Sequence, residues 1–160
     1  MQMSERGKDL LAQWEGVREK LYLDPVGLAT IGIGHLLTRD EISSGKLWIK
    51  GAKVKYYQGL TRSQVMDLLD QDLEIFEKAI NDSVKVELTQ DQFDALASFS
   101  FNVGAHAFVK STLLKVLNQG QYEEVPRQLR RWVYAGGKKL KGMINRREHE
   151  VALWEGRISD

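Results

Sequence analysis

The chain contains no cysteine and only 2 prolines among its 160 residues. Without cysteine, the protein has no disulfide scaffold, no thiol nucleophile and no cysteine-ligated zinc or iron–sulfur site. With 2 prolines and 14 glycines, collagen-like and proline-rich linker architectures are excluded as well. The formal net charge of +1 lacks the basic excess of a general nucleic-acid binder, so no nucleic-acid partner is expected.

Long hydrophobic runs are also missing. The most apolar stretch, 95–109, is shorter than the ~20 residues that span a bilayer, and polar residues and a glycine interrupt it. We therefore expect a buried core helix there and no stable membrane association. Residues 1–16 are too charged for the apolar centre of a signal peptide. The hydrophobic content of 42% is sufficient for one domain with a core.

Helical signals dominate what is present. Thr61 and Thr89 each begin a capping box, with a glutamine three residues later. Further helices are predicted near residues 4–14, 111–118, 122–131 and 143–155. The β signal is confined to residues 17 to about 58, where a turn at 24–27 precedes a predicted strand at 30–35. One small early sheet followed by helices indicates an α+β fold.

The predicted strand at 30–35 reads Thr-Ile-Gly-Ile-Gly-His. Alternation places the two isoleucines and the histidine on one face, and the threonine and both glycines on the other. The second face is almost bare backbone, which would let a flat ligand approach closely. A bulge or a packing glycine would explain the same pattern.

Two carboxylates flank this region. Glu15 follows Trp14 at the end of the first predicted helix, and Asp24 lies at the turn before the strand. Glycoside hydrolysis needs one protonated carboxyl, which donates to the leaving oxygen, and one carboxylate, which activates water or stabilises an oxocarbenium ion. Among 22 acidic residues, such a pair is weak evidence by itself.

The combined spacing is far more specific. The pattern consists of Glu15, Asp24 after eight intervening residues, and Thr30 after five more, at the start of the segment TIGIGHLLT. It closely resembles that of the phage T4-type lysozymes of glycoside hydrolase family 24. Later segments look like the endolysins of that family: SFSFNVG at 98–104, STLL at 111–114, RWVYAGG at 131–137 and NRR at 145–147. The resemblance leaves out about residues 41–59, which we expect to form an added loop at the edge of the cleft.

The resemblance implies that Glu15 is the general acid, that Asp24 positions or activates the attacking water, and that Thr30 holds this water. It implies an inverting hydrolysis of the β-1,4 bond between N-acetylmuramic acid and N-acetylglucosamine in peptidoglycan, with no cofactor. The protein would be one lysozyme domain over 1–160. It would consist of a catalytic lobe at 1–60, a connecting helix at 61–80 and a helical lobe at 81–160.

The resemblance also implies a sugar-binding cleft between the lobes. Four residues would line it: Gly34, Leu36, Phe101 and Ser111. Phe101 could equally belong to the core, since its neighbours look buried. The family places an arginine beside its catalytic glutamate, which predicts a pair between Arg146 and Glu15. A nearby cation favours an ionised carboxyl and so opposes the acid role, hence we assign Arg146 an orienting role.

A carboxylate, Asp72, interrupts the apolar stripe of the helix predicted after Thr61 and therefore needs a partner. The resemblance pairs it with His35. We interpret this pair as a stabilising contact rather than a catalytic one. His106 and His149 have no ligand-like spacing to other residues, so no metal site is expected.

As an endolysin, the protein would act as a monomer that causes host cell lysis. It would accumulate in the host cytoplasm and reach the wall through a separate, holin-type membrane lesion. Three alternatives remain at this stage. A lytic transglycosylase needs no base, a peptidoglycan-binding module needs no catalytic set, and the basic segment 125–147 could disturb membranes as an accessory role.

Overall fold

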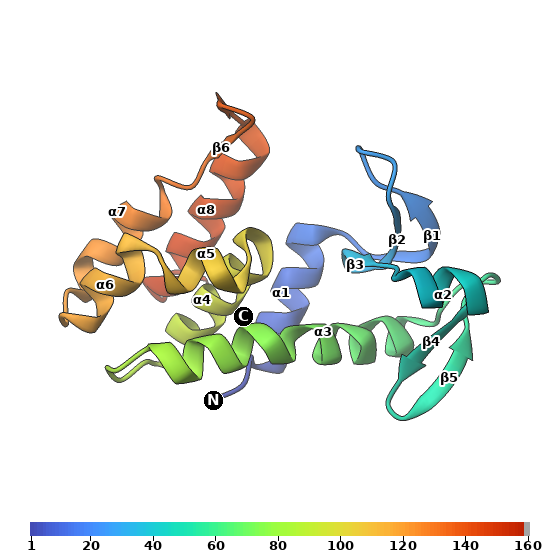
Figure 1. The fold of residues 1–160 in the computed structure, drawn as a ribbon. Helices are drawn as coiled ribbons and strands as arrows, with labels where there is room; N and C mark the ends of the chain where they lie inside the picture. The colour runs from blue at the N-terminus through green and yellow to red at the C-terminus, as the bar shows by residue number, and fades with distance from the viewer. Residues whose placement is uncertain (159–160) are drawn as a thin grey trace. The chain divides into compact units, whose positions relative to one another are not determined.

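The structure is a computed structural model and describes residues 1–158. The chain divides into two compact units. One unit comprises residues 9–74, and the other comprises residues 1–8 together with the chain from Ile75 onward. Two helices, α1 (Glu5–Glu15) and α3 (Arg62–Ser83), each begin in one unit and end in the other. Helices and small antiparallel sheets together give the α+β fold that the sequence predicts (Figure 1).

The 9–74 unit contains all but one pair of the strands found within residues 1–158. Its first sheet is antiparallel with the order β1 (Arg18–Leu23), β2 (Ala29–Gly32) and β3 (His35–Leu36). A short helix α2 (Arg39–Ser44) then leads into a hairpin of β4 (Lys46–Ile49) and β5 (Ala52–Lys55). The apolar face of α3 and the inner faces of these strands form the core of the unit; Ile31, Leu47, Val65 and Leu69 are almost fully buried.

The prediction of one continuous strand over 30–35 is wrong. The chain reverses between Gly32 and Gly34, and Ile31 pairs with His35 across the resulting hairpin. Both glycines have positive φ angles, 71° and 68°, a conformation that favours glycine. The turn therefore explains the two glycines. Cross-strand partners share a face, so His35 still lies on the same face as Ile31.

The segment 41–59 is not the expected loop, because it forms the end of α2 and the β4–β5 hairpin. Thr38 and Glu41 make a reciprocal capping box that starts α2, and Gly45 ends the helix with a φ of 69°. Tyr56 follows the hairpin, is fully buried, and donates a hydrogen bond of 2.8 Å to the Glu41 carbonyl. The segment is thus an ordered part of the 9–74 unit.

The β4–β5 turn offers a test of backbone strain. Lys50 has a φ of 51° and Gly51 a φ of 78°, the two positive angles that favour Asn-Gly in tight hairpins. Lys50→Asn is expected to stabilise the protein by roughly 1 kcal/mol, because asparagine adopts the left-handed region at lower cost. The exposed Lys50–Asp70 pair that is lost contributes little. An unchanged or lower midpoint in thermal unfolding would contradict this expectation.

The second unit is mainly helical. Its elements are α4 (Gln90–Val103), α5 (Ala105–Val109), α6 (Thr112–Asn118), η1 (Tyr122–Glu124), α7 (Val125–Leu129), β6 (Tyr134–Ala135), β7 (Lys138–Lys139) and α8 (Lys141–Trp154). Helix α4 packs along α8 and is buried continuously from Phe93 to Ser100. The helices predicted at 111–118 and 143–155 are confirmed within two residues, whereas 122–131 is divided between η1 and α7.

Two further expectations for this unit are wrong. The stretch 95–109 is not one helix, since Gly104, with a φ of 100°, separates α4 from α5. The β structure does not end near residue 58, because β6 and β7 form a hairpin at 134–139. Gly136 and Gly137 both have positive φ there, and a Gly-Gly pair is itself a hairpin signal.

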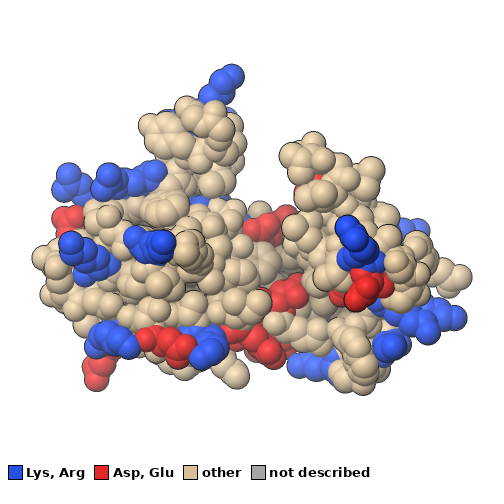
Figure 2. Space-filling view, in the orientation of Figure 1, with Lys and Arg blue, Asp and Glu red and all other residues tan. Residues whose placement is uncertain are grey.

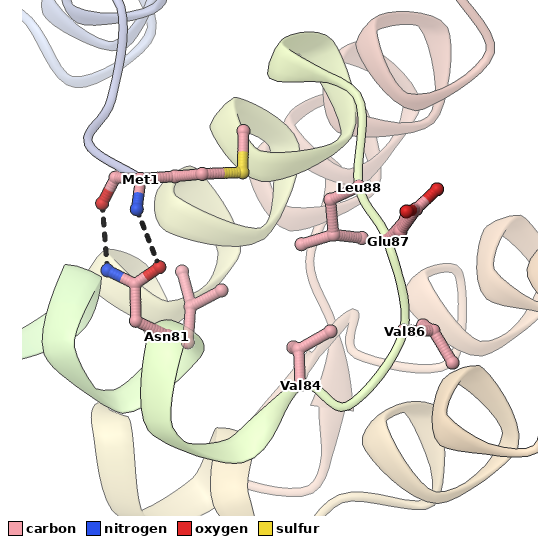
Figure 3. Close-up of a pocket in the computed structure, with 7 residues that line it drawn as sticks. Met1, Asn81, Val84, Val86, Glu87 and Leu88 are labelled. Carbon is pink, nitrogen blue, oxygen red and sulfur yellow. Dashed lines mark hydrogen bonds between the residues drawn. The ribbon is translucent and has the colours of Figure 1, made fainter.

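The amino terminus is anchored within this second unit (Figure 3). The Met1 ammonium donates to the Asn81 side-chain oxygen at 2.9 Å, and the Asn81 amide donates back to the Met1 carbonyl at 2.8 Å. Met1 and Asn81 help to line a hollow of about 420 Å³ together with residues of the segment 84–88. No helix within residues 1–158 is both long and apolar enough to cross a membrane.

Candidate active site

Asp24 is held in place by the turn between β1 and β2. Its Oδ1 atom accepts hydrogen bonds from the backbone N–H groups of Val26 and Leu28, at 3.0 and 2.8 Å. The Gly27 N–H donates to the Asp24 carbonyl at 2.9 Å and closes the turn. Its Oδ2 atom has no protein partner among the described residues. The turn therefore fixes one carboxylate oxygen and leaves the other able to bind water.

Thr30 is tied to the same turn through Leu28. The Thr30 hydroxyl donates to the Leu28 carbonyl at 2.9 Å, while the Leu28 N–H donates to Asp24. Thr30 is only 2% exposed, so its hydroxyl has little freedom to rotate away. Its single proton is used in this bond, which leaves the oxygen able to accept. Sequence reasoning missed Leu28, because its contribution comes from the backbone and no side-chain pattern reports it.

Glu15 is the last residue of α1 and is half-buried. The helix ends there because Gly16, with a φ of 84°, donates its N–H to the Ala12 carbonyl at 2.9 Å and turns the chain toward β1. Glu15, Asp24 and Thr30 all belong to the 9–74 unit. The three predicted catalytic residues are therefore carried by one compact body.

The four predicted sugar-binding residues are divided between the units. Gly34 and Leu36 lie in the 9–74 unit, where Leu36 pairs with Thr30 and is 52% exposed. In the other unit, half-buried Phe101 packs edge-on against Phe76, with ring centroids 5.5 Å apart. Ser111 is buried as the N-cap of α6, and its hydroxyl accepts from the Leu114 N–H. That hydroxyl also donates to a carbonyl at 2.6 Å. Their roles in sugar binding stay predictions.

His35 bridges two carboxylates. Its Nδ1 lies 2.8 Å from Asp72 Oδ2, and its Nε2 lies 3.0 Å from Glu41 Oε1. Burial lowers the pKa of the imidazole, but hydrogen bonds and charges from both carboxylates outweigh this and raise it to about 9. Sequence reasoning missed Glu41, although its capping box with Thr38 is readable from the sequence. Three elements, β3, α2 and α3, are thereby joined.

The raised pKa of His35 makes stability depend on pH. The folded-state pKa of about 9 exceeds the unfolded value of 6.5, so the contribution is complete below pH 6.5 and is lost as the pH rises through 9. We expect Asp72→Asn to lower the free energy of unfolding by about 2 kcal/mol at pH 6 and by much less at pH 10. Urea denaturation at both pH values measures this. Glu74→Gln, an exposed change on the same helix, should show no such pH dependence.

Arg146 lies in a buried polar cluster within the second unit. Its Nε atom donates to Ser98 Oγ at 3.2 Å and to Glu150 Oε2 at 3.0 Å. Arg147 pairs with the other oxygen of Glu150 at 2.7 Å. Glu15 belongs to the other unit, so the predicted Glu15–Arg146 pair stays a prediction. Sequence reasoning did not single out Arg147 or Glu150, although their i, i+3 spacing was a signal.

Residues 1–158 contain no group of three or more histidine, aspartate or glutamate side chains that could hold a metal ion. The groups that the candidate site presents are carboxyl, hydroxyl and backbone groups, and such groups can perform acid–base hydrolysis.

Comparison with solved structures identifies the class as that of lysozymes. A P22 lysozyme mutant superposes with a TM-score of 0.81 at 37% identity, over 97% of this chain and 99% of that one. The muramidase domain of SpmX from Asticaccaulis excentricus gives a TM-score of 0.77 at 31% identity, over 96% and 97%. The sequence model for "Phage lysozyme" matches residues 12–150. The chain belongs to the phage lysozyme family.

Curated relatives carry endolysin names. The SAR-endolysin of Escherichia phage Mu is 40% identical over 156 residues, which are 98% of this chain and 82% of that protein. The endolysin of Bacillus phage PZA is 37% identical over 156 residues, or 96% of this chain. The chain spans about half, 55%, of the length of the PZA protein.

Proposed function

We propose that this protein is an endolysin with muramidase activity, which hydrolyses the β-1,4 bond between N-acetylmuramic acid and N-acetylglucosamine in peptidoglycan. One observation carries the proposal. Leu28 connects Asp24 and Thr30 through its two backbone polar groups, in the same compact unit as Glu15. Endolysin and lysozyme relatives along nearly the whole chain support it.

In this mechanism, Glu15 donates a proton to the leaving glycosidic oxygen. The Oδ2 atom of Asp24 accepts one proton from the attacking water, and the Thr30 oxygen accepts a hydrogen bond from the O–H that the water keeps. Water then attacks the anomeric carbon from the face opposite the leaving group, which is an inverting single displacement. This assignment follows the resemblance to glycoside hydrolase family 24, and the reaction uses no cofactor.

The same proposal assigns the remaining predicted residues. Two lobes, 1–60 and 81–160, joined by the helix at 61–80, would enclose the glycan. Gly34 and Leu36 would contact the sugars from one lobe, Phe101 and Ser111 from the other. Arg146 would orient Glu15. The protein would act as a monomer after release from the host cytoplasm through a holin-type lesion.

The mass of the products from purified peptidoglycan tests the proposal. A muramidase adds one water per cleavage and leaves a reducing N-acetylmuramic acid end. Anhydro products would instead establish a lytic transglycosylase, whose chemistry gives Asp24 no role as base. If folded protein leaves the sacculi intact but sediments with them, the non-catalytic binding module replaces the enzyme.

A further inference from the structure

The outward face of the β4–β5 hairpin is basic, and the fold does not need it to be. Antiparallel pairing sets Lys46 opposite Lys55 and Trp48 opposite Lys53. The alternate residues of β4 are buried, so the packing that holds the hairpin comes from its other face. Two lysines directly opposite each other destabilise a strand pair. Packing alone therefore does not explain this face.

The protein does not neutralise these charges. Among residues 1–158, Lys46, Lys53 and Lys55 make no ion pair. Trp48 is 57% exposed, and the Lys53 ammonium lies 5.9 Å from the centroid of its indole ring. Basic side chains gather around the part of the 9–74 unit that carries β4 and β5 (Figure 2). An anionic group could approach this face without displacing an internal partner.

A groove of about 400 Å³ lies between this face and helix α2. One wall carries Asp40, whose carboxylate has no side-chain partner among the described residues. Glu41, on the same wall, is already bound inside the unit. The facing wall carries three hairpin side chains: Lys46, Trp48 and Lys53. The groove thus presents a carboxylate on one side, and two ammonium groups with an aromatic ring on the other.

A short peptide with carboxylates and one ammonium group matches this arrangement in charge. We propose that the groove binds the stem peptide that N-acetylmuramic acid carries in peptidoglycan, an inference that rests on the proposed muramidase function. Stem carboxylates would pair with Lys46 and Lys53, and the ammonium of the diamino acid with Asp40. An anionic membrane fits less well, because Asp40 repels its headgroups and Trp48 is the one large apolar side chain exposed within 46–55.

A titration of the ¹⁵N-labelled full chain with the tripeptide N-acetyl-L-alanyl-γ-D-glutamyl-meso-diaminopimelate, which carries one ammonium group, tests the binding. Saturable shifts are expected at the Trp48 indole N–H and at the backbone amides of Lys46 and Lys53. The variant Lys46→Gln/Lys53→Gln should bind roughly tenfold more weakly. Lys138→Gln/Lys139→Gln removes the same charge from the exposed strand β7 and should bind like the wild type.

Hydrolysis assays separate this inference from the proposed function. Wild type that cuts neither intact sacculi nor glycan strands stripped of their peptides would refute the muramidase. Support for the groove would be a Lys46→Gln/Lys53→Gln variant that is slower on sacculi but equals the wild type on stripped strands. No saturable shift at Trp48, or equal weakening in both double variants, would overturn it. Shifts caused by phosphatidylglycerol vesicles but not by the tripeptide would also overturn it, in favour of a membrane contact.

Discussion

Glu15→Gln is expected to reduce the rate of peptidoglycan hydrolysis by roughly 10²- to 10⁴-fold, the usual contribution of a positioned general acid. Glutamine keeps the size and hydrogen-bonding capacity of the side chain but cannot donate a proton to the leaving sugar oxygen. Glu15 is the last residue of α1 and half-buried, so the fold should tolerate the change. The release of reducing ends measures the rate, and thermal unfolding checks that the variant is folded.

Glu19→Gln provides the matched control. Glu19 lies in β1 of the same unit, its side chain is exposed, and the exchange removes the same charge. Wild-type activity is expected for this variant. If Glu15→Gln retained more than about a tenth of the wild-type rate, with products unchanged, another group would have to donate the proton.

Local chemistry made most of the fold predictable. The capping boxes at Thr61 and Thr89 place the starts of α3 and α4 correctly. A capping box is formed within four consecutive residues, so it can be recognised in the sequence without knowledge of the rest of the fold. Glycines were harder to interpret. Gly32 and Gly34 fit a strand with an open face equally well until their positive φ angles show a turn. A glycine in the sequence does not reveal which of its permitted conformations the chain uses.

The candidate site was likewise predictable only in part from the sequence. Glu15, Asp24 and Thr30 could be proposed because their spacing repeats a family pattern, and the resemblance also supplied His35 with Asp72. The groups that position these residues could not be predicted from the sequence. Leu28 acts through backbone atoms, and Glu41 reaches His35 only because α2 and β3 fold against each other. Contacts made by backbone groups or across several elements leave no periodic trace in a sequence.

The buried cluster on α8 carries the second large expected effect. Glu150 is fully buried and accepts three charged or polar donors: Arg147 at 2.7 Å, Arg146 at 3.0 Å and Ser98 at 2.6 Å. Glu150→Gln removes the counter-charge and leaves two buried guanidinium groups. We expect the free energy of unfolding to fall by about 3–5 kcal/mol, measured by urea denaturation at pH 7. Glu148→Gln, which breaks only an exposed pair with Arg130, should cost less than about 1 kcal/mol.

The origin of this loss can be tested further by removing one of the two cations. If uncompensated charge is the cause, Arg147→Met/Glu150→Gln should be more stable than Glu150→Gln alone, because one buried guanidinium has gone and the methionine fills much of its volume. Three lost contacts of Arg147 oppose this gain: its hydrogen bonds to the Trp132 carbonyl and to the Asn102 side-chain oxygen, and its contact with the Phe99 ring. A double variant less stable than the single one would show that these contacts, and not the buried charge, hold α8 to its neighbours.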